Sequence, residues 1–321
     1  MRIFITGVLG LIGSNLAEYL VNKGHTIVSC DDLSGSSKQG REHIINHPNH
    51  IFHKLRVCEE NLDKLKQITR GCDVLYHLSC WPYEGISSFS PVCVSKSVIE
   101  GTTAIAVCAS ENKIPRVLNA SSNARYGNIE TPYKEDMECS PADVYGHAKL
   151  CAEKMLNNLG SLHGFKVAHF VFYNVFGKYC RTNDPFRSVI AIWANCLLSG
   201  KQPVIFDGKQ KRKIAFVQDV VPLISNFLDC NFEHGEIFNV GADGEEITIE
   251  QLYNLVLDVM DLDVPAKYLP SRPLEVKNAF SSCEKIKKKF VVGDGVLLRD
   301  RIKEFIDWIK DEGVWPFDSS L

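Results

Sequence analysis

The chain has 321 residues, of which 45% are apolar and 23% are charged, a composition typical of a globular protein with one large core and a smaller lobe. Its formal net charge is −3, and its longest basic run is KIKKK at 285–289, which we interpret as a solvated face, so we expect no nucleic-acid and no membrane partner. The 12 cysteines include no CxxC pair, which predicts reduced thiols and a cytoplasmic location.

The first third of the chain alternates short β-rich runs with helical stretches. Strands are predicted at RIFIT, TIVSC and DVLYHLS, and helices over about 11–23 and 60–69. The first strand begins directly after Met1, so we expect no export signal. Strands that alternate with helices predict a parallel sheet with helices on both faces, which is the doubly wound α/β (Rossmann) fold.

The run HIINHPNHIFH stands between two of these strands. Its histidines have no cysteine or carboxylate between them, and its Pro-Asn pair is typical of a loop. We therefore expect a solvated loop here and no metal site in the chain. The histidines concerned are His43, His47, His50 and His53.

The alternating pattern continues to Gly177 and then changes. A helix near 94–111, the strand RVLNASS, the helical run ADVYGHAKLCAEKM and the strand KVAHFVFYNVFG follow in order. Beyond them lie longer helices, more loops and the turn-rich GADGEEIT. We predict a first domain over 1–177 and a smaller α+β lobe over 178–321, with the chain crossing back to the first domain.

The turn after the first strand reads TGVLGLIGS, with glycines at Gly7, Gly10 and Gly13. Such glycines allow a tight turn and a close approach to a diphosphate, while the helix that follows presents free N–H groups to the anion. Asp31 closes the second strand, where a carboxylate can bind both hydroxyls of an adenosine ribose and repels a 2′-phosphate. The glycine turn therefore predicts a dinucleotide cofactor, and Asp31 predicts that it is NAD rather than NADP. Asp32 either adds to this site or caps the next turn.

Tyr145 and Lys149 lie four residues apart in the run ADVYGHAKLCAEKM, so they share one face of the predicted helix. Chance supplies about one pair of this spacing in such a chain, and Tyr19 with Lys23 is a second. That second pair lies at the far end of the first helix, away from the glycine turn. We assign it to surface structure.

With these motifs the chain resembles the extended short-chain dehydrogenase/reductases, and among them the NAD-dependent nucleotide-sugar epimerases and dehydratases, of the UDP-glucose 4-epimerase type. Members carry TGxxGxxG, an acidic residue ending the second strand, a hydroxyl residue four before a Tyr-Gly pair, and YxxxK on the next helix. Here these are TGVLGLIG, Asp31, Ser122 ahead of Tyr126, and Tyr145 with Lys149.

Later segments extend the resemblance over nearly the whole chain. FYNVFG is similar to the family's RxFNVYG and places Asn174, and IFDGKQKRKIAFVQDV is similar to its GDGxxxRDFxxVxD and places Arg212 and Asp219. FNVGADGEEITIEQL and PSRPLEV resemble two further segments, the second of which aligns Arg272.

The resemblance implies a role for each of these residues. Lys149 and a positive nicotinamide would lower the pKa of Tyr145, which would take a proton from a sugar hydroxyl while Ser122 shares a hydrogen bond at the same oxygen. The implied NAD-binding residues are Gly7, Gly10, Leu11, Ile12, Gly13, Asp31, Asp32, Ser34, Leu78, Tyr145, Lys149 and Phe172. The implied residues for a nucleotide-diphosphate sugar are Ser122, Tyr145, Asn174, Arg212 and Arg272, the two arginines suiting the diphosphate. Similar proteins form homodimers through the helices near 94–111 and 145–159, so a homodimer is implied.

The sequence also departs from the family pattern. Arg56 and Val98 replace an Asp and an Asn of the cofactor pocket, and Val171 replaces the Arg of RxFN. Cys80 and Trp81 stand where small residues are usual. The expected fold does not depend on these positions, but details of the pockets do.

Three functions fit this pattern. A 4-epimerase is favoured, because 4,6-dehydratases that resemble this chain place Asp and Glu directly after the hydroxyl residue, whereas Asn123 and Ala124 stand here. The alternatives are 4,6- or 5,6-dehydration or 4-oxidation at the same Ser/Tyr/Lys site, and a non-catalytic NAD-binding regulator. The base and the sugar are not specified by the sequence.

Overall fold

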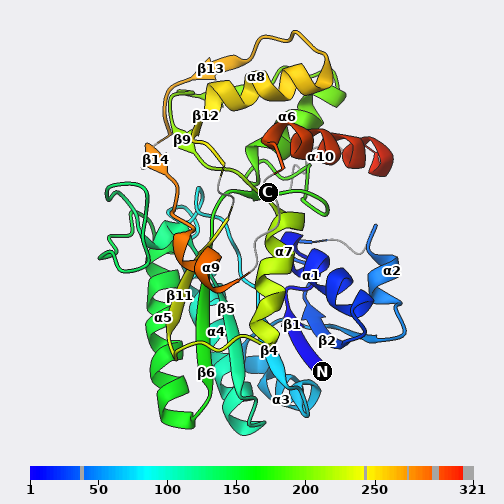
Figure 1. The fold of residues 1–321 in the computed structure, drawn as a ribbon, viewed down its shortest axis with the longest axis vertical. Coiled ribbons are helices and arrows are strands. Elements are labelled where there is room, and N and C mark those ends of the chain that lie inside the picture. Colours follow the sequence, from blue (N-terminus) through cyan, green and yellow to red (C-terminus); the bar gives the residue numbers. More distant parts are fainter. Residues whose placement is uncertain (37–39, 242–243, 273–274, 291–295, 314–321) are drawn as a thin grey trace.

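A seven-stranded parallel sheet forms the centre of the protein in the computed structural model, which describes residues 1–36, 40–241, 244–272, 275–290 and 296–313 (Figure 1). The strand order is β11-β6-β5-β4-β1-β2-β3. This order confirms the predicted doubly wound α/β fold. The strands are β1 Arg2–Thr6, β2 Thr26–Asp31, β3 His50–Lys54, β4 Val74–His77, β5 Arg116–Ser122, β6 Lys166–Phe172 and β11 Glu236–Val240.

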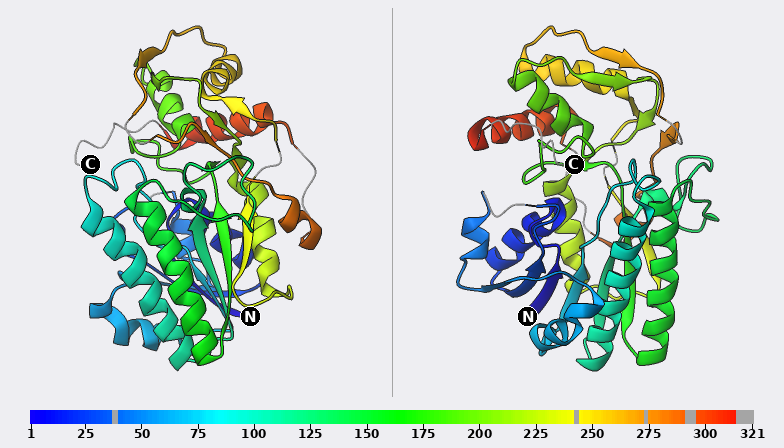
Figure 2. Two further views of the ribbon diagram at one scale, coloured as in Figure 1. Left: turned by 90° about the vertical axis from the view of Figure 1, so that its left-hand side faces the viewer. Right: turned by 180° about the vertical axis from the view of Figure 1, so that it is seen from behind.

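Helices cover both faces of the sheet because its strands are apolar on both sides. Ile3 and Ile5 face a core shared with α1 and α7, whereas Phe4 between them faces a core shared with α3, α4 and α5. Figure 2 shows α4 and α5 side by side on one face. The helices are α1 Leu11–Asn22, α3 Leu62–Thr69, α4 Pro91–Glu111, α5 Val144–His163 and α7 Val217–Ser225.

The histidine-rich run is not the solvated loop that we expected. It contains most of the short helix α2 Glu42–Ile45 and most of the edge strand β3 His50–Lys54, and only residues 46–49, which include the Pro-Asn pair, lie between them. His50 is buried, and its ring nitrogens lie 2.6 Å from Ser29 Oγ and 2.7 Å from the carbonyl of Ile44. An edge strand pairs on one side only, so its polar residues hid the strand pattern. The described residues contain no group of three His, Cys, Asp or Glu side chains suited to a metal ion.

The second lobe lies beyond the carboxyl ends of the strands (Figure 1). Its core packs Trp193, Tyr253 and Phe305 between three helices and two small sheets. The turn predicted at GADGEEIT falls partly outside the described residues, which omit 242–243. The elements are α6 Val189–Leu198, β8 Val204–Phe206, β9 Lys211–Arg212, β12 Ile247–Thr248, α8 Ile249–Met260, β13 Lys267–Leu269, β14 Asn278–Ala279 and α10 Leu298–Glu312.

The chain crosses between the central sheet and the second lobe more than once. The parallel pair β7 Val175–Phe176 and β10 Ala215–Phe216 leads back to α7, and β11 then pairs with β6 in the central sheet. The short helix α9 Glu284–Lys289 packs on β11. The division of the sequence at residue 177 stays a prediction.

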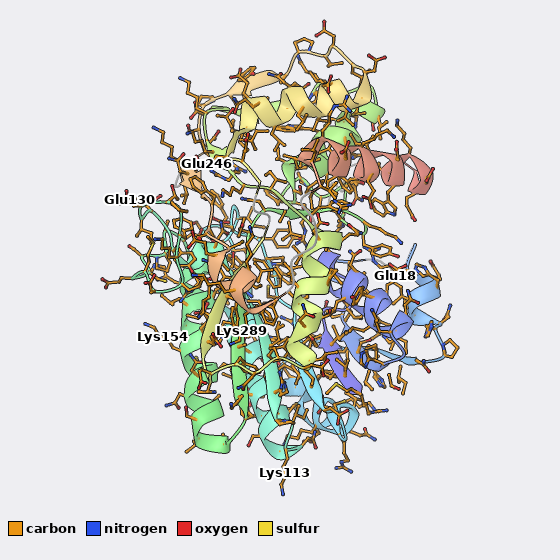
Figure 3. All side chains as sticks on the ribbon, viewed as in Figure 1. Glu18, Lys113, Glu130, Lys154, Glu246 and Lys289 are labelled. Atoms are coloured by element: carbon orange, nitrogen blue, oxygen red, sulfur yellow. The ribbon has the colours of Figure 1, made fainter. Side chains whose placement is uncertain are left out.

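Charged residues of both signs lie on the outside. Lys113, Glu130 and Lys154 point away from the sheet (Figure 3). Within the basic run on α9, Lys285 and Lys289 form ion pairs with Glu236 at 3.5 and 2.6 Å, so part of its charge is neutralised.

Helix α4 is the one described helix that is long and apolar enough to cross a bilayer by composition. Half of its most apolar window is buried in the protein, as in core helices of soluble proteins. It packs against α3 and α5, which explains its apolar character without a membrane.

Candidate active site

A cavity of about 1670 Å³ lies between the carboxyl ends of the strands and the second lobe. Ligands bind at this end of open parallel sheets, and a single small molecule usually occupies about 300–1,000 Å³, so this cavity has room for two ligands. Every site residue expected from the sequence lines it. These are Gly7, Gly10, Leu11, Ile12, Gly13, Asp31, Asp32, Ser34, Leu78, Ser122, Tyr145, Lys149, Phe172, Asn174, Arg212 and Arg272.

The glycine turn leaves the start of α1 open to an anion. Gly7 has φ +66°, and a Cβ on Gly13 would lie 2.2 Å from the Gly7 carbonyl oxygen, so neither position accepts a side chain without movement. The N-cap Gly10 has no side chain to cap the helix, and the first turn carries no acidic residue. The N–H groups and the positive end of the helix dipole therefore suit the diphosphate of a dinucleotide.

Asp31 holds the loop after β2 against this turn. Its carboxylate accepts hydrogen bonds from the N–H groups of Leu9 at 3.0 Å and Leu33 at 2.9 Å, and from Ser36 Oγ at 2.8 Å. A carboxylate has about four lone-pair positions, so these three bonds to described residues leave room for a ribose hydroxyl. The negative charge fits the free hydroxyls of NAD and opposes the 2′-phosphate of NADP.

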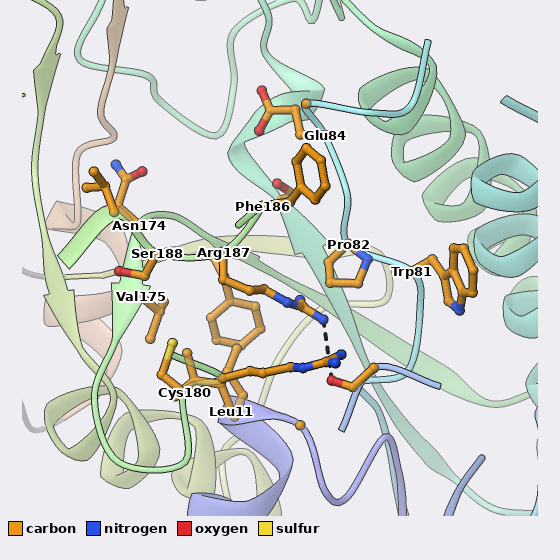
Figure 4. A pocket seen from close by; sticks show the side chains of 18 of the residues that line it. Leu11, Trp81, Pro82, Glu84, Asn174, Val175, Cys180, Phe186, Arg187 and Ser188 are labelled. Atoms are coloured by element: carbon orange, nitrogen blue, oxygen red, sulfur yellow. Dashed lines mark hydrogen bonds between the residues drawn. The ribbon is translucent and has the colours of Figure 1, made fainter. Parts of the chain in front are cut away.

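Asp32 caps the next turn, as one of the two alternatives predicted. Its Oδ1 accepts hydrogen bonds from the N–H of Ser34 at 2.9 Å and from the Ser34 hydroxyl at 2.6 Å. The Trp81 indole N–H in turn donates to Ser34 Oγ at 3.1 Å. The bulky residue after β4 is therefore tied to the cofactor loop, and Figure 4 shows its ring beyond Pro82, away from Glu84.

The three predicted catalytic residues converge where β5 ends and α5 begins. Asp143 caps α5 by accepting a hydrogen bond from the Gly146 N–H at 2.8 Å, which places Tyr145 in the first helical turn. Lys149 is buried and donates to the carbonyl of Ala120 at 2.7 Å, so β5 fixes its ammonium group.

The pKa of Tyr145 is raised, not lowered, by the surroundings that the protein provides. Burial of the phenol is the largest cause, and the nearby Cys80 and Glu84 raise the pKa further. A hydrogen bond with Ser122 lowers it. Lys149, from which we expected a lowering, is not among the main causes of this shift. A lowering by positive charge would have to come from the nicotinamide of a bound cofactor.

The two Tyr/Lys pairs have nearly the same local geometry. The Lys149 Nζ lies 5.7 Å from the centre of the Tyr145 ring, and the Lys23 Nζ lies 5.5 Å from that of Tyr19. Neither Tyr19 nor Lys23 lines the cavity. Position in the fold, and not helical spacing, therefore separates the two pairs.

The side chains predicted for the substrate are built into the cavity wall. Asn174 donates to the carbonyl of Lys213 at 3.0 Å, and Arg212 donates to the carbonyls of Val276 at 2.8 Å and Lys277 at 3.0 Å. Arg272 donates to Glu275 at 3.0 Å. Both arginines are held in place before a ligand arrives.

The departures from the family pattern are accommodated by packing. Val98 and Val171 are buried, the first beside Tyr145 and the second beside Tyr126. Arg56 lines the cavity near the cofactor loop.

Sequence reasoning missed a cluster at the cavity wall, in which Tyr83 and Asp184 are buried and Arg187 lines the cavity. The Tyr83 hydroxyl donates to Asp184 Oδ2 at 2.9 Å, and Arg187 Nε donates to the same oxygen at 3.0 Å. Arg187, which is labelled in Figure 4, also stacks over the Tyr83 ring at 4.7 Å and donates to the carbonyl of Gly35 at 3.5 Å. Glu84, which follows Tyr83, was missed as well. No local pattern signals contacts between residues this far apart in the sequence.

Known proteins share both the sequence pattern and the fold. A model of the NAD dependent epimerase/dehydratase family matches residues 3–241. A UDP-glucose 4-epimerase of Mycolicibacterium smegmatis is 29% identical over 85% of this chain and 87% of that protein. A UDP-N-acetyl-alpha-D-glucosaminuronate decarboxylase of Bacillus cytotoxicus is 25% identical over 97% of this chain and 98% of that protein.

A solved structure agrees with these similarities. The UDP-N-acetylglucosamine 4-epimerase of Methanobrevibacter ruminantium superimposes with a TM-score of 0.89 at 25% identity, over 97% of this chain and 99% of that chain. The family model spans most of the sequence, and the cavity carries the glycine turn, the acidic residue after β2 and the Tyr/Lys pair. The chain is therefore an NAD-dependent enzyme of the epimerase/dehydratase family that acts on nucleotide sugars.

Proposed function

We propose that the enzyme is a nucleotide-sugar 4-epimerase that acts through a transient 4-ketosugar. The observation that carries the proposal is the short turn Asn123–Arg125 directly after Ser122. The amide of Asn123 and the methyl group of Ala124 cannot exchange protons, so the acid and base that dehydration needs are missing from this turn. UDP-hexoses are the proposed substrates, because the two 4-epimerases and the decarboxylase among the relatives are all named for UDP-sugars.

In this proposal Tyr145 takes the proton of the C4 hydroxyl and later returns it. Ser122, which hydrogen-bonds the phenol, shares a hydrogen bond with the same sugar oxygen. Lys149, held by the carbonyl of Ala120, lies on the same helix face as Tyr145, where its amino group would stabilise the phenolate. When bound, NAD accepts the hydride from C4 and gives it back.

Epimerisation further requires that the ketosugar present its opposite face before the hydride returns. The size of the cavity supports this step, as do Arg212 and Arg272 in its wall. If the two arginines hold the diphosphate, the sugar ring can rotate without leaving the site. Release of the ketosugar would make the reaction an oxidation instead.

The test is NMR of the product formed from a UDP-hexose with a catalytic amount of NAD. A C4 epimer supports the proposal. A deoxy-ketosugar, an exocyclic enol ether or stoichiometric NADH would each replace it with dehydration or oxidation.

We propose in addition a cytoplasmic homodimer that pairs through α4 and α5. All 12 cysteines are free thiols, which supports a reducing compartment. Val92 and Leu162 on these helices are exposed, at 73% and 72%. Light scattering on the purified enzyme would measure the mass, and a monomer at micromolar concentration would refute the dimer.

A further inference from the structure

The loop after β4 carries a carboxylate into the cavity. Glu84 and its neighbours Pro82 and Gly85 line it, as do Ser122 and Tyr145. The loop is fixed on both sides of this residue. Tyr83 is bound to Asp184, and the Ser87 N–H and hydroxyl donate to the Glu84 carbonyl at 3.1 and 2.9 Å.

Glu84 differs from the other carboxylates at this end of the cavity. Asp143 caps α5, and Glu275 forms ion pairs with Arg272 at 3.0 Å and Arg212 at 4.0 Å. The Glu84 carboxylate makes no hydrogen bond or ion pair with any residue that the structure describes. Its surface is open to the cavity, so its hydrogen-bonding capacity is available to a ligand.

The negative charge of Glu84 affects the pKa of the catalytic Tyr145. It is one of the causes that raise the pKa of Tyr145. Enclosure by the cavity walls raises the pKa of Glu84 itself to about 7, with Asp143 and Glu275 acting in the same direction and Arg212 and Arg272 opposing them. The carboxylate therefore ionises within the neutral range.

We propose that Glu84 determines the sugar class of this enzyme: it admits nucleotide-linked hexoses without an acid group and rejects hexuronates. The inference rests on the proposed function of the cavity as a nucleotide-sugar site. It separates the chain from relatives such as the decarboxylase, whose name specifies an acidic sugar.

Hydrogen bonding and charge repulsion act together in this selection. Sugar hydroxyls donate to a carboxylate, and a carboxylate is acceptor-only when ionised. A hexuronate would bring a second negative charge, and two such charges about 5 Å apart at an effective dielectric constant of about 20 correspond to an affinity loss of about 10²-fold. Arg212 and Arg272 offset part of this repulsion, but their charge is shared with Glu275 and, in the proposed function, with the diphosphate.

The experiment measures binding to the NAD-loaded Tyr145→Phe enzyme, in which turnover is blocked. Calorimetry gives the affinities for UDP, UDP-glucose and UDP-glucuronate. At pH 8 we expect UDP-glucuronate to bind at least about tenfold more weakly than UDP-glucose. When Glu84→Gln is added to Tyr145→Phe, the affinities for UDP-glucose and UDP-glucuronate should differ by no more than about threefold. The affinity for UDP should be unchanged. Glu245→Gln, at an exposed position outside the cavity, is the matched control and should change nothing.

The pH dependence gives a second readout. With a pKa of about 7, Glu84 is about one-tenth ionised at pH 6 and about nine-tenths ionised at pH 8. The UDP-glucose to UDP-glucuronate affinity ratio should therefore rise by about tenfold over this interval. With Glu84→Gln the ratio should stay flat.

The outcomes separate this inference from the proposed reaction. Equal affinities at pH 8, or a preference that survives Glu84→Gln, would overturn the inference even if the native enzyme forms a C4 epimer. A Glu84-dependent preference together with another product would leave the inference standing and overturn epimerisation. If neither sugar nucleotide binds, both are wrong.

Discussion

Replacement of Tyr145 by Phe should abolish most turnover and leave the fold intact. The substitution removes one buried hydroxyl group, whose hydrogen bond with Ser122 contributes about 1 kcal/mol to stability. The ring itself stays packed against Val94, Val98 and Ala148. The free energy of unfolding should therefore fall by no more than about 1.5 kcal/mol.

The expected kinetic effect is much larger than the effect on stability. A positioned acid/base group contributes about 10²- to 10⁴-fold, which corresponds to about 2.7–5.4 kcal/mol of transition-state stabilisation. Burial raises the pKa of Tyr145, so the phenolate fraction of the free enzyme grows with pH throughout the neutral range. Wild-type turnover should therefore rise with pH, and the residual turnover of Tyr145→Phe should lose this dependence.

The matched control is Tyr19→Phe, since Tyr19 faces Lys23 with almost the same geometry outside the cavity. Both variants would be compared by urea unfolding, by calorimetric titration with NAD and by steady-state turnover of a UDP-hexose. Tyr19→Phe should match the wild type in all three. Near-normal turnover of Tyr145→Phe, or equal losses in the two variants, would refute the assignment of Tyr145 as the proton acceptor.

Three further predictions concern cofactor and nucleotide binding. Asp31→Ala should reduce the preference for NAD over NADP, measured as the ratio of their calorimetric affinities, and an unchanged ratio would contradict the role of the carboxylate. Gly13→Ala should weaken NAD binding by at least about tenfold, because the new Cβ would lie 2.2 Å from the Gly7 carbonyl oxygen. Gly244→Ala, whose Cβ would meet no atom within 4 Å, should leave NAD binding unchanged. Arg212→Ala and Arg272→Ala should each weaken UDP by about 10- to 100-fold, the equivalent of charge-assisted hydrogen bonds of about 1.5–3 kcal/mol, and full affinity in both would place the diphosphate elsewhere.

Local patterns were sufficient to predict the nucleotide end and the catalytic pair. The glycine turn, Asp31 and the Tyr145/Lys149 spacing each lie within one strand, turn or helix, and short-range geometry dictates their form. The strand β3 escaped prediction because its edge position lets polar side chains alternate irregularly.

Long-range contacts could not be predicted in the same way. Tyr83 and Asp184 are 101 residues apart, and nothing in either neighbourhood indicates that they meet. The raised pKa of Tyr145 depends on burial by residues from several elements, which spacing on one helix does not reveal. Glu84 became a candidate only when the structure placed it in the same cavity as the catalytic residues.

The return of the chain to the sheet at β11 has a consequence for synthesis. Every residue of β6 after Lys166 is buried, yet its outer edge is paired only when Glu236–Val240 arrives. A nascent chain that ends near Gly177 would present this apolar edge to solvent, and such edges pair with other chains and aggregate. The first 177 residues are therefore not expected to be stable when expressed alone. If the substrate lobe is exchanged between relatives, β11 and the central sheet must come from the same protein.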